Sequence, residues 1–517
     1  MPSELPHPAD THAPPAAGQP AAGPPPTALP GGLPAAEVLE ELRALRGSDA
    51  PTRGGRTFAY VYDAGIEGLD ALAAAAYSEY ATVNGLDMTV FPSVARLEND
   101  LIRAAAALLG APGTQGTFTS GGTESILLAV KTARDHARAE RGVREPELVL
   151  PSTAHAAFHK AAAYLGVEPV VVPVDRGTYR ADAEATAAAV TERTALVVAS
   201  APSYAHGVID PVAQIAGLAA DRGVLCHVDA CIGGWLLPYL RRAGREVPDF
   251  GMTVPGVTSL SVDLHKYGYA DKGASVVLYR DAELRRYQYF AHAGWPGYPV
   301  VNPTVQGTKA AGLLAQAWAV LRHVGEDGYT ALAGQVADAS DRLLAGLRAV
   351  EGVRVLGEPE AGLVAFTLAA AEDAGGGGDL SLLLHLADEM RVRGWYLQPQ
   401  LEFEGMPPNL HLTLTPATVG QVDALLADLA EALTAARALP PVQADPGLVE
   451  LAAGLDPSTL GPEEVSAVLA YAGLGGGEDG DARLPQRMAP VLVLLDALPQ
   501  ALQERLLSEF VGSVFRI

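Results

Sequence analysis

Two lysines, Lys266 and Lys272, lie in one short segment between two runs of strand-forming residues. The chain of 517 residues has 36 basic residues, yet only five are lysine, because arginine occupies nearly every ordinary basic position. Arginine does not release its proton, whereas a lysine removed from water can become a free amine and attack a carbonyl group. The segment therefore predicts amine chemistry, with Lys266 as the residue that carries a carbonyl cofactor.

Two further side chains follow strand-forming runs and could contact such a cofactor. Asp229 follows the apolar run Val224–Val228, and an acid at the carboxyl end of a strand lies where α/β sheets bind ligands. There it could pair with the nitrogen of a pyridinium ring and keep the ring an electron sink. The alternative is that Asp229 caps the next helix. His155 could stack on the ring, and the alternative is an ordinary surface or core histidine.

The segment Thr119–Ser125 joins a predicted strand to a predicted helix through Gly121, Gly122 and Thr123. Glycines let an anion approach the backbone, and a helix start offers unpaired N–H groups and the positive end of the helix dipole. The Thr123 hydroxyl could donate one more hydrogen bond. These features favour a phosphate cradle, with a simple Gly-Gly turn as the alternative. Amine, acid and cradle together predict pyridoxal phosphate.

The elements that must position these residues alternate between strand and helix from about residue 116. Several of the strands are continuously apolar, as strands buried on both faces are, and the helices between them provide crossovers. The pattern predicts an α/β fold whose large domain has a mostly parallel seven-stranded sheet. The predicted strands are Gly116–Thr119, Leu148–Pro151, Pro169–Val174, Ala195–Ser200, Val224–Val228, Thr258–Val262 and Ala274–Tyr279.

Composition and periodicity divide the chain into five segments. A Pro/Ala-rich arm is expected to be disordered, because it cannot bury enough side chain to order. A helical and extended segment, the large cofactor-binding domain, a smaller C-terminal α+β domain and a helical tail follow. The tail is expected to end in one amphipathic helix near Pro490–Phe515. In order, the segments are 1–34, 35–95, 96–325, 326–440 and 441–517.

The net charge of −24 at pH 7 argues against nucleic-acid binding and against docking on anionic membranes. Cys226 and Cys231 lie in one apolar run and suggest neither a disulfide framework nor a zinc site, which favours a reducing cytoplasm. The N-terminus lacks the regions of a signal peptide, and no apolar run predicts a transmembrane helix. We therefore expect a cytoplasmic protein without a membrane anchor.

Five segments, in a fixed order, match a known family. They are Thr119–Leu127, Ala154–Phe158, His206–Pro211, His227–Gly234 and His265–Gly273. On these segments the chain, from about residue 91 to 416, resembles the pyridoxal-phosphate-dependent decarboxylase superfamily of fold type I. The run His-Lys-Tyr-Gly-Tyr, with a second lysine six residues after the first, resembles the sphingosine-1-phosphate lyase branch of that superfamily. The resemblance implies a fold like that of the fold type I PLP-dependent transferases.

The resemblance implies a role for each candidate residue. Lys266 would form the internal aldimine with pyridoxal 5'-phosphate (PLP), Asp229 would bind the pyridine nitrogen, and His155 would stack on the ring. Lys272 and Tyr62 match positions at which the lyases contact the phosphate end of the substrate. The cofactor phosphate would be held by Gly121, Gly122, Thr123 and His265.

The resemblance also implies a homodimer with shared active sites, because Gly307 and Thr308 would reach the cofactor phosphate of the partner subunit. Three positions depart from the lyase pattern. Asp87 replaces a histidine, Val300 replaces a tyrosine, and Lys309 replaces an arginine. A carboxylate at position 87 would repel a phosphate that a histidine attracts. The departures therefore concern the substrate rather than the cofactor.

The expected reaction is retro-aldol cleavage of a phosphorylated long-chain amino alcohol to a fatty aldehyde and phosphoethanolamine. Lys272 or Tyr62 would take the proton of the β-hydroxyl group. The alternative is decarboxylation of an L-amino acid, because the bond that stands perpendicular to the cofactor ring is the one that breaks. A third possibility is a catalytically inactive PLP-binding protein, against which the intact Lys266 and Asp229 argue.

Overall fold

The computed structural model describes residues 31–369, 378–457, 459–461, 465 and 485–515, so nearly all of the predicted N-terminal arm lies outside the described residues. The chain divides into two compact units. The larger unit comprises Ala50–Ala444 and Arg487–Asp496. The smaller unit comprises the described parts of Met1–Asp49, Asp445–Gln486 and Ala497–Ile517. The five segment boundaries expected from the sequence stay predictions.

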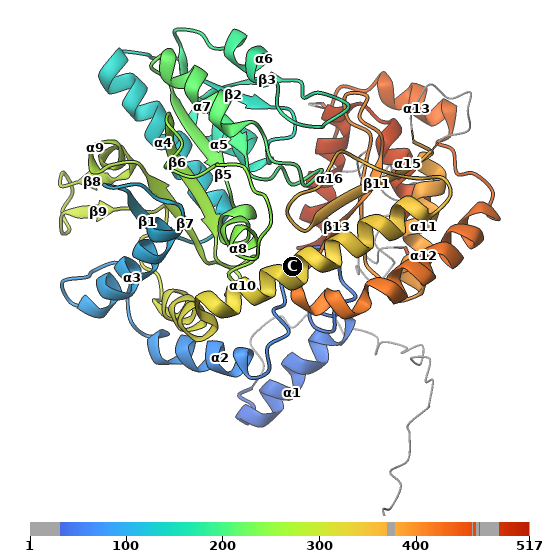
Figure 1. Ribbon diagram of the computed structural model, residues 1–517, viewed down its shortest axis with the longest axis horizontal. Coiled ribbons are helices and arrows are strands. Elements are labelled where there is room, and N and C mark those ends of the chain that lie inside the picture. Colours follow the sequence, from blue (N-terminus) through green and yellow to red (C-terminus); the bar gives the residue numbers. More distant parts are fainter. Residues whose placement is uncertain (1–30, 370–377, 458, 462–464, 466–484, 516–517) are drawn as a thin grey trace, which may run out of the picture. The chain divides into compact units, whose positions relative to one another are not determined.

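A seven-stranded sheet forms the centre of the larger unit, as the strand pattern predicted (Figure 1). The strand order is β1-β7-β6-β5-β4-β2-β3, and β7 runs antiparallel to both of its neighbours while the other pairs are parallel. The carboxyl ends of the parallel strands thus lie at one edge, where such sheets bind ligands. The strands are β1 (Gln115–Thr119), β2 (Glu147–Pro151), β3 (Glu168–Val172), β4 (Thr194–Ser200), β5 (Leu225–Asp229), β6 (Val257–Asp263) and β7 (Ser275–Tyr279).

Helices cover both faces of this sheet, because successive strand residues point to opposite sides. Leu148 and Leu150 of β2 belong to the hydrophobic cluster beneath α4 and α5, whereas Val149 between them belongs to the cluster on the other face. The helices of the two faces are α4 (Gly122–Arg141) and α5 (Ala157–Leu165) on one, and α3 (Pro92–Leu109), α7 (Val212–Asp221) and α8 (Leu237–Arg242) on the other.

A second sheet, four-stranded and antiparallel, follows the long helix α10. The backbone of α10 leaves helical values at Gly325 (φ 64°, ψ 175°), so it consists of two helices joined at a glycine. The sequence missed the edge strand β12, which is only three residues long and contains Pro399. These elements are α10 (Gly312–Ala349), β10 (Val353–Val355), β11 (Leu363–Leu368), α11 (Leu380–Val392), β12 (Gln398–Gln400), β13 (Asn409–Thr413) and α12 (Val422–Arg437).

An extended piece near Phe58 is held in the larger unit by backbone hydrogen bonds. The Phe58 N–H donates to the Tyr396 carbonyl at 2.9 Å, and the Thr413 N–H donates to the Phe58 carbonyl at 2.6 Å. These bonds fix the chain just before Tyr62. The remaining elements are α1 (Ala35–Leu45), α2 (Leu69–Tyr80), α6 (Ala183–Ala188), α9 (Ala282–Arg285), β8 (Phe290–His292), β9 (Val300–Asn302) and α13 (Pro446–Ala453).

The expectation of one C-terminal helix near Pro490–Phe515 is wrong. Two helices, α15 (Ala489–Ala497) and α16 (Gln500–Val514), are separated at Pro499, which precedes the first residue of α16. Proline lacks the N–H that a helix interior needs, so it separates the two helices. In the part of the chain that the structure describes, every helix is too short or too polar to cross a bilayer.

Candidate active site

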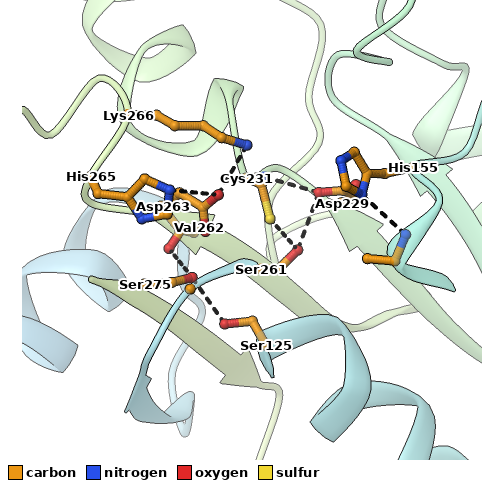
Figure 2. A network of polar contacts seen from close by, with 12 residues as sticks. Ser125, His155, Asp229, Cys231, Ser261, Val262, Asp263, His265, Lys266 and Ser275 are labelled. Carbon is orange, nitrogen blue, oxygen red and sulfur yellow. Dashed lines mark hydrogen bonds and ion pairs between the residues drawn. The ribbon is translucent and has the colours of Figure 1, made fainter. Parts of the chain in front are cut away.

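The carboxyl ends of β5 and β6 border a cavity of about 380 Å³ in the larger unit. Figure 2 shows Lys266 and Asp229 approaching it from different segments, with Cys231 between them. The structure thus brings together the amine and the acid that the sequence placed at separate strand ends. Seven sequence-predicted residues line the cavity, namely Gly121, Gly122, Thr123, His155, Asp229, His265 and Lys266.

Lys266 forms an ion pair that the sequence analysis missed. Its Nζ lies 2.9 Å from Oδ2 of Asp263, the last residue of β6. Burial lowers the pKa of Lys266, but Asp263, with smaller contributions from Cys231, Tyr62 and Asp229, outweighs burial, so the net pKa is raised. Burial likewise raises the pKa of Asp263, while Lys266 and His265 lower it more. Both groups are therefore charged, and the strand-end rule that identified Asp229 would also have identified Asp263.

Asp229 is held through one of its two carboxylate oxygens. Oδ1 accepts hydrogen bonds from the Cys231 N–H at 3.1 Å and from the Ser261 hydroxyl at 3.3 Å. Oδ2 makes no hydrogen bond with any of the residues described, and Asp229 lines the cavity. One oxygen is thus available to a ligand that carries an N–H group.

The start of α4 forms a backbone cradle on the cavity wall. Gly121 is the N-cap residue of α4, and its φ of 147° lies in a region that favours glycine. Because glycine has no side chain, no side chain caps the N–H groups at the helix start. A Cβ atom on Gly122 would lie 2.8 Å from the Asp263 carboxylate and from Cys231 Sγ. The first N–H groups of a helix have no partner inside it. The cradle is therefore open to an anion only because both residues lack side chains.

Glu124, which the sequence analysis did not select, fixes this cradle. One carboxylate oxygen accepts the Ser120 N–H at 2.6 Å, and the other accepts the Val305 N–H at 2.7 Å. The side chain is buried. Glu124 therefore ties the loop that precedes α4 to the loop that follows β9.

Two histidines border the cavity with defined ring orientations. His265 donates from Nδ1 to the Ala274 carbonyl at 2.8 Å, and its Nε2 lies 3.7 Å from Asp263 Oδ2. Burial lowers the pKa of His265, although Asp263 opposes that effect. His155 accepts the Ala157 N–H at Nδ1, at 3.1 Å, which fixes its ring at the start of α5 (Figure 2). The ring is exposed and available for stacking.

Tyr62 and Lys272 lie together in an adjoining cavity of about 440 Å³, which shares His265 with the first. The Lys272 ammonium lies 4.8 Å from the centre of the Tyr62 ring. Burial, together with the charge of Lys266, lowers the pKa of Lys272 to about 8. Burial raises the pKa of Tyr62. Near neutral pH the lysine is thus closer to losing a proton than the tyrosine is.

The remaining predicted positions line neither cavity. Thr308 is exposed on the loop after β9, next to Gly307. Asp87 lies in an exposed turn, where its carboxylate accepts the Thr89 hydroxyl at 2.6 Å, and that hydrogen bond lowers its pKa. Val300 belongs to the β8–β9 hairpin, and Lys309 donates to the Thr304 hydroxyl at 3.3 Å. These four residues are therefore not part of the lining of either cavity.

The chemistry of the first cavity fits PLP. An amine faces the cavity, a free carboxylate oxygen can receive a ring N–H, and a glycine cradle at a helix start can accept a phosphate. The close approach of Gly122 to Asp263 and Cys231 shows that a side chain would fill the cradle.

Two domain families match the chain. The pyridoxal-dependent decarboxylase conserved domain matches residues 52–369, and the C-terminal putative HTH domain of pyridoxal-dependent enzymes matches residues 446–513. The chain is 38% identical over 411 residues to the sphingosine-1-phosphate lyase of Arabidopsis thaliana, across 78% of this chain and 73% of that protein. It is 32% identical over 363 residues to a probable L-tyrosine/L-aspartate decarboxylase of Methanothermobacter thermautotrophicus, across 69% of this chain and 93% of that protein.

A solved structure supports the same relationship. The sphingosine-1-phosphate lyase of Burkholderia pseudomallei superposes with a TM-score of 0.74 at 36% sequence identity, across 80% of this chain and 93% of that one.

Proposed function

The chain belongs to the pyridoxal-dependent decarboxylase family and is a PLP-dependent lyase, and we propose that it cleaves the Cα–Cβ bond of a phosphorylated long-chain amino alcohol. The products would be a fatty aldehyde and phosphoethanolamine. The observation that carries the proposal is the pair Lys272 and Tyr62, which borders the cavity of Lys266 in a chain whose relatives are sphingosine-1-phosphate lyases.

Each predicted cofactor-binding residue of the first cavity then has one role. PLP supplies an electron sink for the bonding pair of the cleaved bond. Lys266 would hold the cofactor through its amine, and Asp229 would receive the pyridine N–H. His155 would stack on the ring. The phosphate would be bound by the backbone of Gly121 and Gly122, by Thr123 and by His265.

Lys272 is the base that takes the β-hydroxyl proton in this proposal. Its pKa of about 8 leaves an appreciable fraction of free amine near neutral pH, as a general base requires. The raised pKa of Tyr62 keeps the phenol protonated, so Tyr62 donates a hydrogen bond to the substrate instead. The contact of 4.8 Å between the Lys272 ammonium and the Tyr62 ring keeps both groups at the same place.

We also propose that the protein is a homodimer with shared active sites. Thr308 is exposed and lines neither cavity of its own chain, so we infer that it reaches the cofactor phosphate of a partner subunit. The neighbouring β8–β9 hairpin exposes large apolar side chains, which protein interfaces bury. The two cysteines are free thiols, and we infer a reducing compartment such as the cytoplasm.

A substrate panel tests the function directly. The purified holoenzyme is incubated with sphingosine 1-phosphate and, separately, with each L-amino acid. We expect aldehyde and phosphoethanolamine from the first and no carbon dioxide from the others. Release of carbon dioxide without aldehyde would replace the lyase proposal by a decarboxylase.

The decarboxylase remains a second candidate for specific reasons. The Methanothermobacter relative is a probable decarboxylase, and Asp87 and Val300 depart from the lyase pattern at positions that bear on the substrate. The panel should therefore include tyrosine and aspartate, the two amino acids in the name of that relative.

A further inference from the structure

Four polar residues of β5 and β6 lie on one face of the seven-stranded sheet. The two strands are parallel, and His227 is opposite Ser259 while Asp229 is opposite Ser261. Side chains alternate along a strand, so all four point to the same face, and Val228 between His227 and Asp229 belongs to the cluster on the other face. The motifs His-x-Asp and Ser-x-Ser thus produce one polar row inside an apolar sheet.

The row is a continuous chain of hydrogen bonds that ends at the carboxylate. Ser259 Oγ lies 2.8 Å from His227 Nδ1, and His227 Nε2 lies 3.2 Å from Ser261 Oγ. The Ser261 hydroxyl donates to Asp229 Oδ1 at 3.3 Å. The Cys231 thiol also donates to Ser261 Oγ, at 3.2 Å.

The Asp229 carboxylate, which can only accept, determines which group donates in each hydrogen bond of this row. Because the only hydrogen of Ser261 Oγ goes to Asp229, Ser261 must accept from His227, so His227 carries its proton on Nε2. Nδ1 is then an acceptor for the Ser259 hydroxyl. All donors point toward Asp229, and aligned hydrogen bonds of this kind strengthen one another.

Burial preserves these donor and acceptor roles along the row. His227 is fully buried, with the Phe158 ring of α5 at 5.8 Å, and burial lowers its pKa to about 4. The imidazole is therefore neutral at physiological pH, with one donor and one acceptor nitrogen. Burial also raises the pKa of Cys231, so its thiol keeps the proton that it donates.

We propose that Ser259, His227 and Ser261 are positioning residues that hold the Asp229 carboxylate in place through Oδ1 and leave its Oδ2 to the cofactor cavity. The proposal rests on the role of Asp229 at the pyridine nitrogen given above. None of the three residues lines the cavity, so each acts through Asp229 alone. Their task is to keep the pyridine nitrogen of bound PLP protonated.

The experiment compares Ser261→Ala with Ser200→Ala, a matched control. Ser200 is the residue opposite Asp229 on the other neighbouring strand, and its buried hydroxyl has no hydrogen-bond partner among the residues that the structure describes. Two quantities are measured, namely the dissociation constant of PLP and the ¹⁵N chemical shift of the labelled pyridine nitrogen in the holoenzyme as a function of pH. We expect Ser261→Ala to weaken PLP binding about tenfold and to move the nitrogen toward its unprotonated shift, because hydrogen bonds to a charged group are strong. Ser200→Ala should change neither quantity.

Further variants keep the test decisive. Ser261→Thr retains the hydroxyl and should restore the nitrogen shift, and Ser259→Ala, one step farther along the chain, should give a smaller effect in the same direction. An unchanged nitrogen shift in both Ser261→Ala and Ser259→Ala would overturn the proposed positioning role of this row. Asp229→Ala tests the role of Asp229 separately from that of the positioning residues. An unchanged nitrogen shift in that variant would overturn the role of Asp229 at the pyridine nitrogen.

Discussion

At the scale of single residues, the charge on Lys266 depends on a neighbour three positions away. Asp263 lies 2.9 Å from the amine and raises its pKa, although burial acts in the opposite direction. A protonated amine cannot attack an aldehyde, so this ion pair opposes the first bond to the cofactor. Breaking one half of a buried pair leaves the other charge uncompensated, which makes the protein without cofactor sensitive to this position.

Asp263→Asn should therefore change the pH dependence of cofactor loading. Removal of the carboxylate lets the pKa of Lys266 fall, so the free amine is present at lower pH and loading near pH 7 becomes faster. The measurement is the growth of cofactor absorbance after protein freed of PLP is mixed with PLP at several pH values. Lys266→Ala gives the baseline, because it cannot form the covalent bond. Equal loading profiles for Asp263→Asn and the unmodified protein would contradict the prediction.

Lys272 gives a prediction in which the sign of the pH effect identifies the role. Since its pKa is lowered to about 8, the free amine accumulates as the pH rises through 8, and kcat/KM should rise and then level off. Lys272→Met and Lys272→Arg should both remove this limb and reduce turnover by roughly 10²-fold or more, because arginine keeps the charge but does not release a proton. Retained activity in Lys272→Arg would instead assign Lys272 to binding the substrate phosphate.

At the level of secondary-structure elements, the cradle at the start of α4 can form because Gly121 and Gly122 have no side chains. The helix begins at Gly122 directly after β1, and β1 is itself the edge strand beside β7. Glu124 accepts N–H groups from both adjoining loops, so the cradle has a fixed shape before any ligand arrives. A preformed cradle does not lose backbone entropy when it binds a phosphate.

Gly122→Ala should damage this cradle. The added methyl group would lie 2.8 Å from the Asp263 carboxylate and from Cys231 Sγ, so the helix start must move. Overpacking of this kind costs about 1–3 kcal/mol, and we expect PLP binding to weaken by at least about tenfold. Equilibrium titration with PLP measures the effect. Gly217→Ala in α7 is the control, because its methyl group would meet no atom of the described residues within 4 Å, apart from the adjoining residues and backbone of its own helix.

At the scale of the whole molecule, the β8–β9 hairpin and the loop after it expose apolar side chains beside Thr308. A soluble surface seldom gathers so many large apolar groups unless a partner covers them. The exposed side chains are Phe290, Trp295, Tyr298, Val301 and Val305. The proposed dimer buries this surface and carries Thr308 to the other subunit's cofactor.

Val301→Lys should weaken self-association by about tenfold or more, because an interface would have to bury an unpaired charge. Sedimentation equilibrium measures the association, and titration with PLP should show weaker binding in the variant, since Thr308 of the partner is lost. Val392→Lys makes the same change at an exposed valine on α11 and should alter neither quantity. A dimer of unchanged strength in Val301→Lys would remove the hairpin from the interface.

The strands and the central helices could be predicted because their residues follow simple periodicities. The seven predicted strands, several of them continuously apolar, have ends within about two residues of those observed. Elements whose boundaries leave no mark on the hydrophobic periodicity were predicted wrongly. The strand β12 is short and contains a proline, and the C-terminal helix divides at Pro499 within an otherwise helical pattern.

Residue types and their local order were enough to predict the cofactor, because rare lysines, a strand-end acid and a glycine-rich helix start are local patterns that chemistry restricts. They were also enough to predict the fold class, because strand and helix periods are properties of neighbouring residues. Which groups meet depends on the folding of the whole chain. Lys272 beside Tyr62 and the row from Ser259 to Asp229 join separate segments through loop closure and strand register, and register fixes contacts that no single segment contains. Even Asp263 and Lys266, three residues apart, pair only because of the turn that the chain makes after β6.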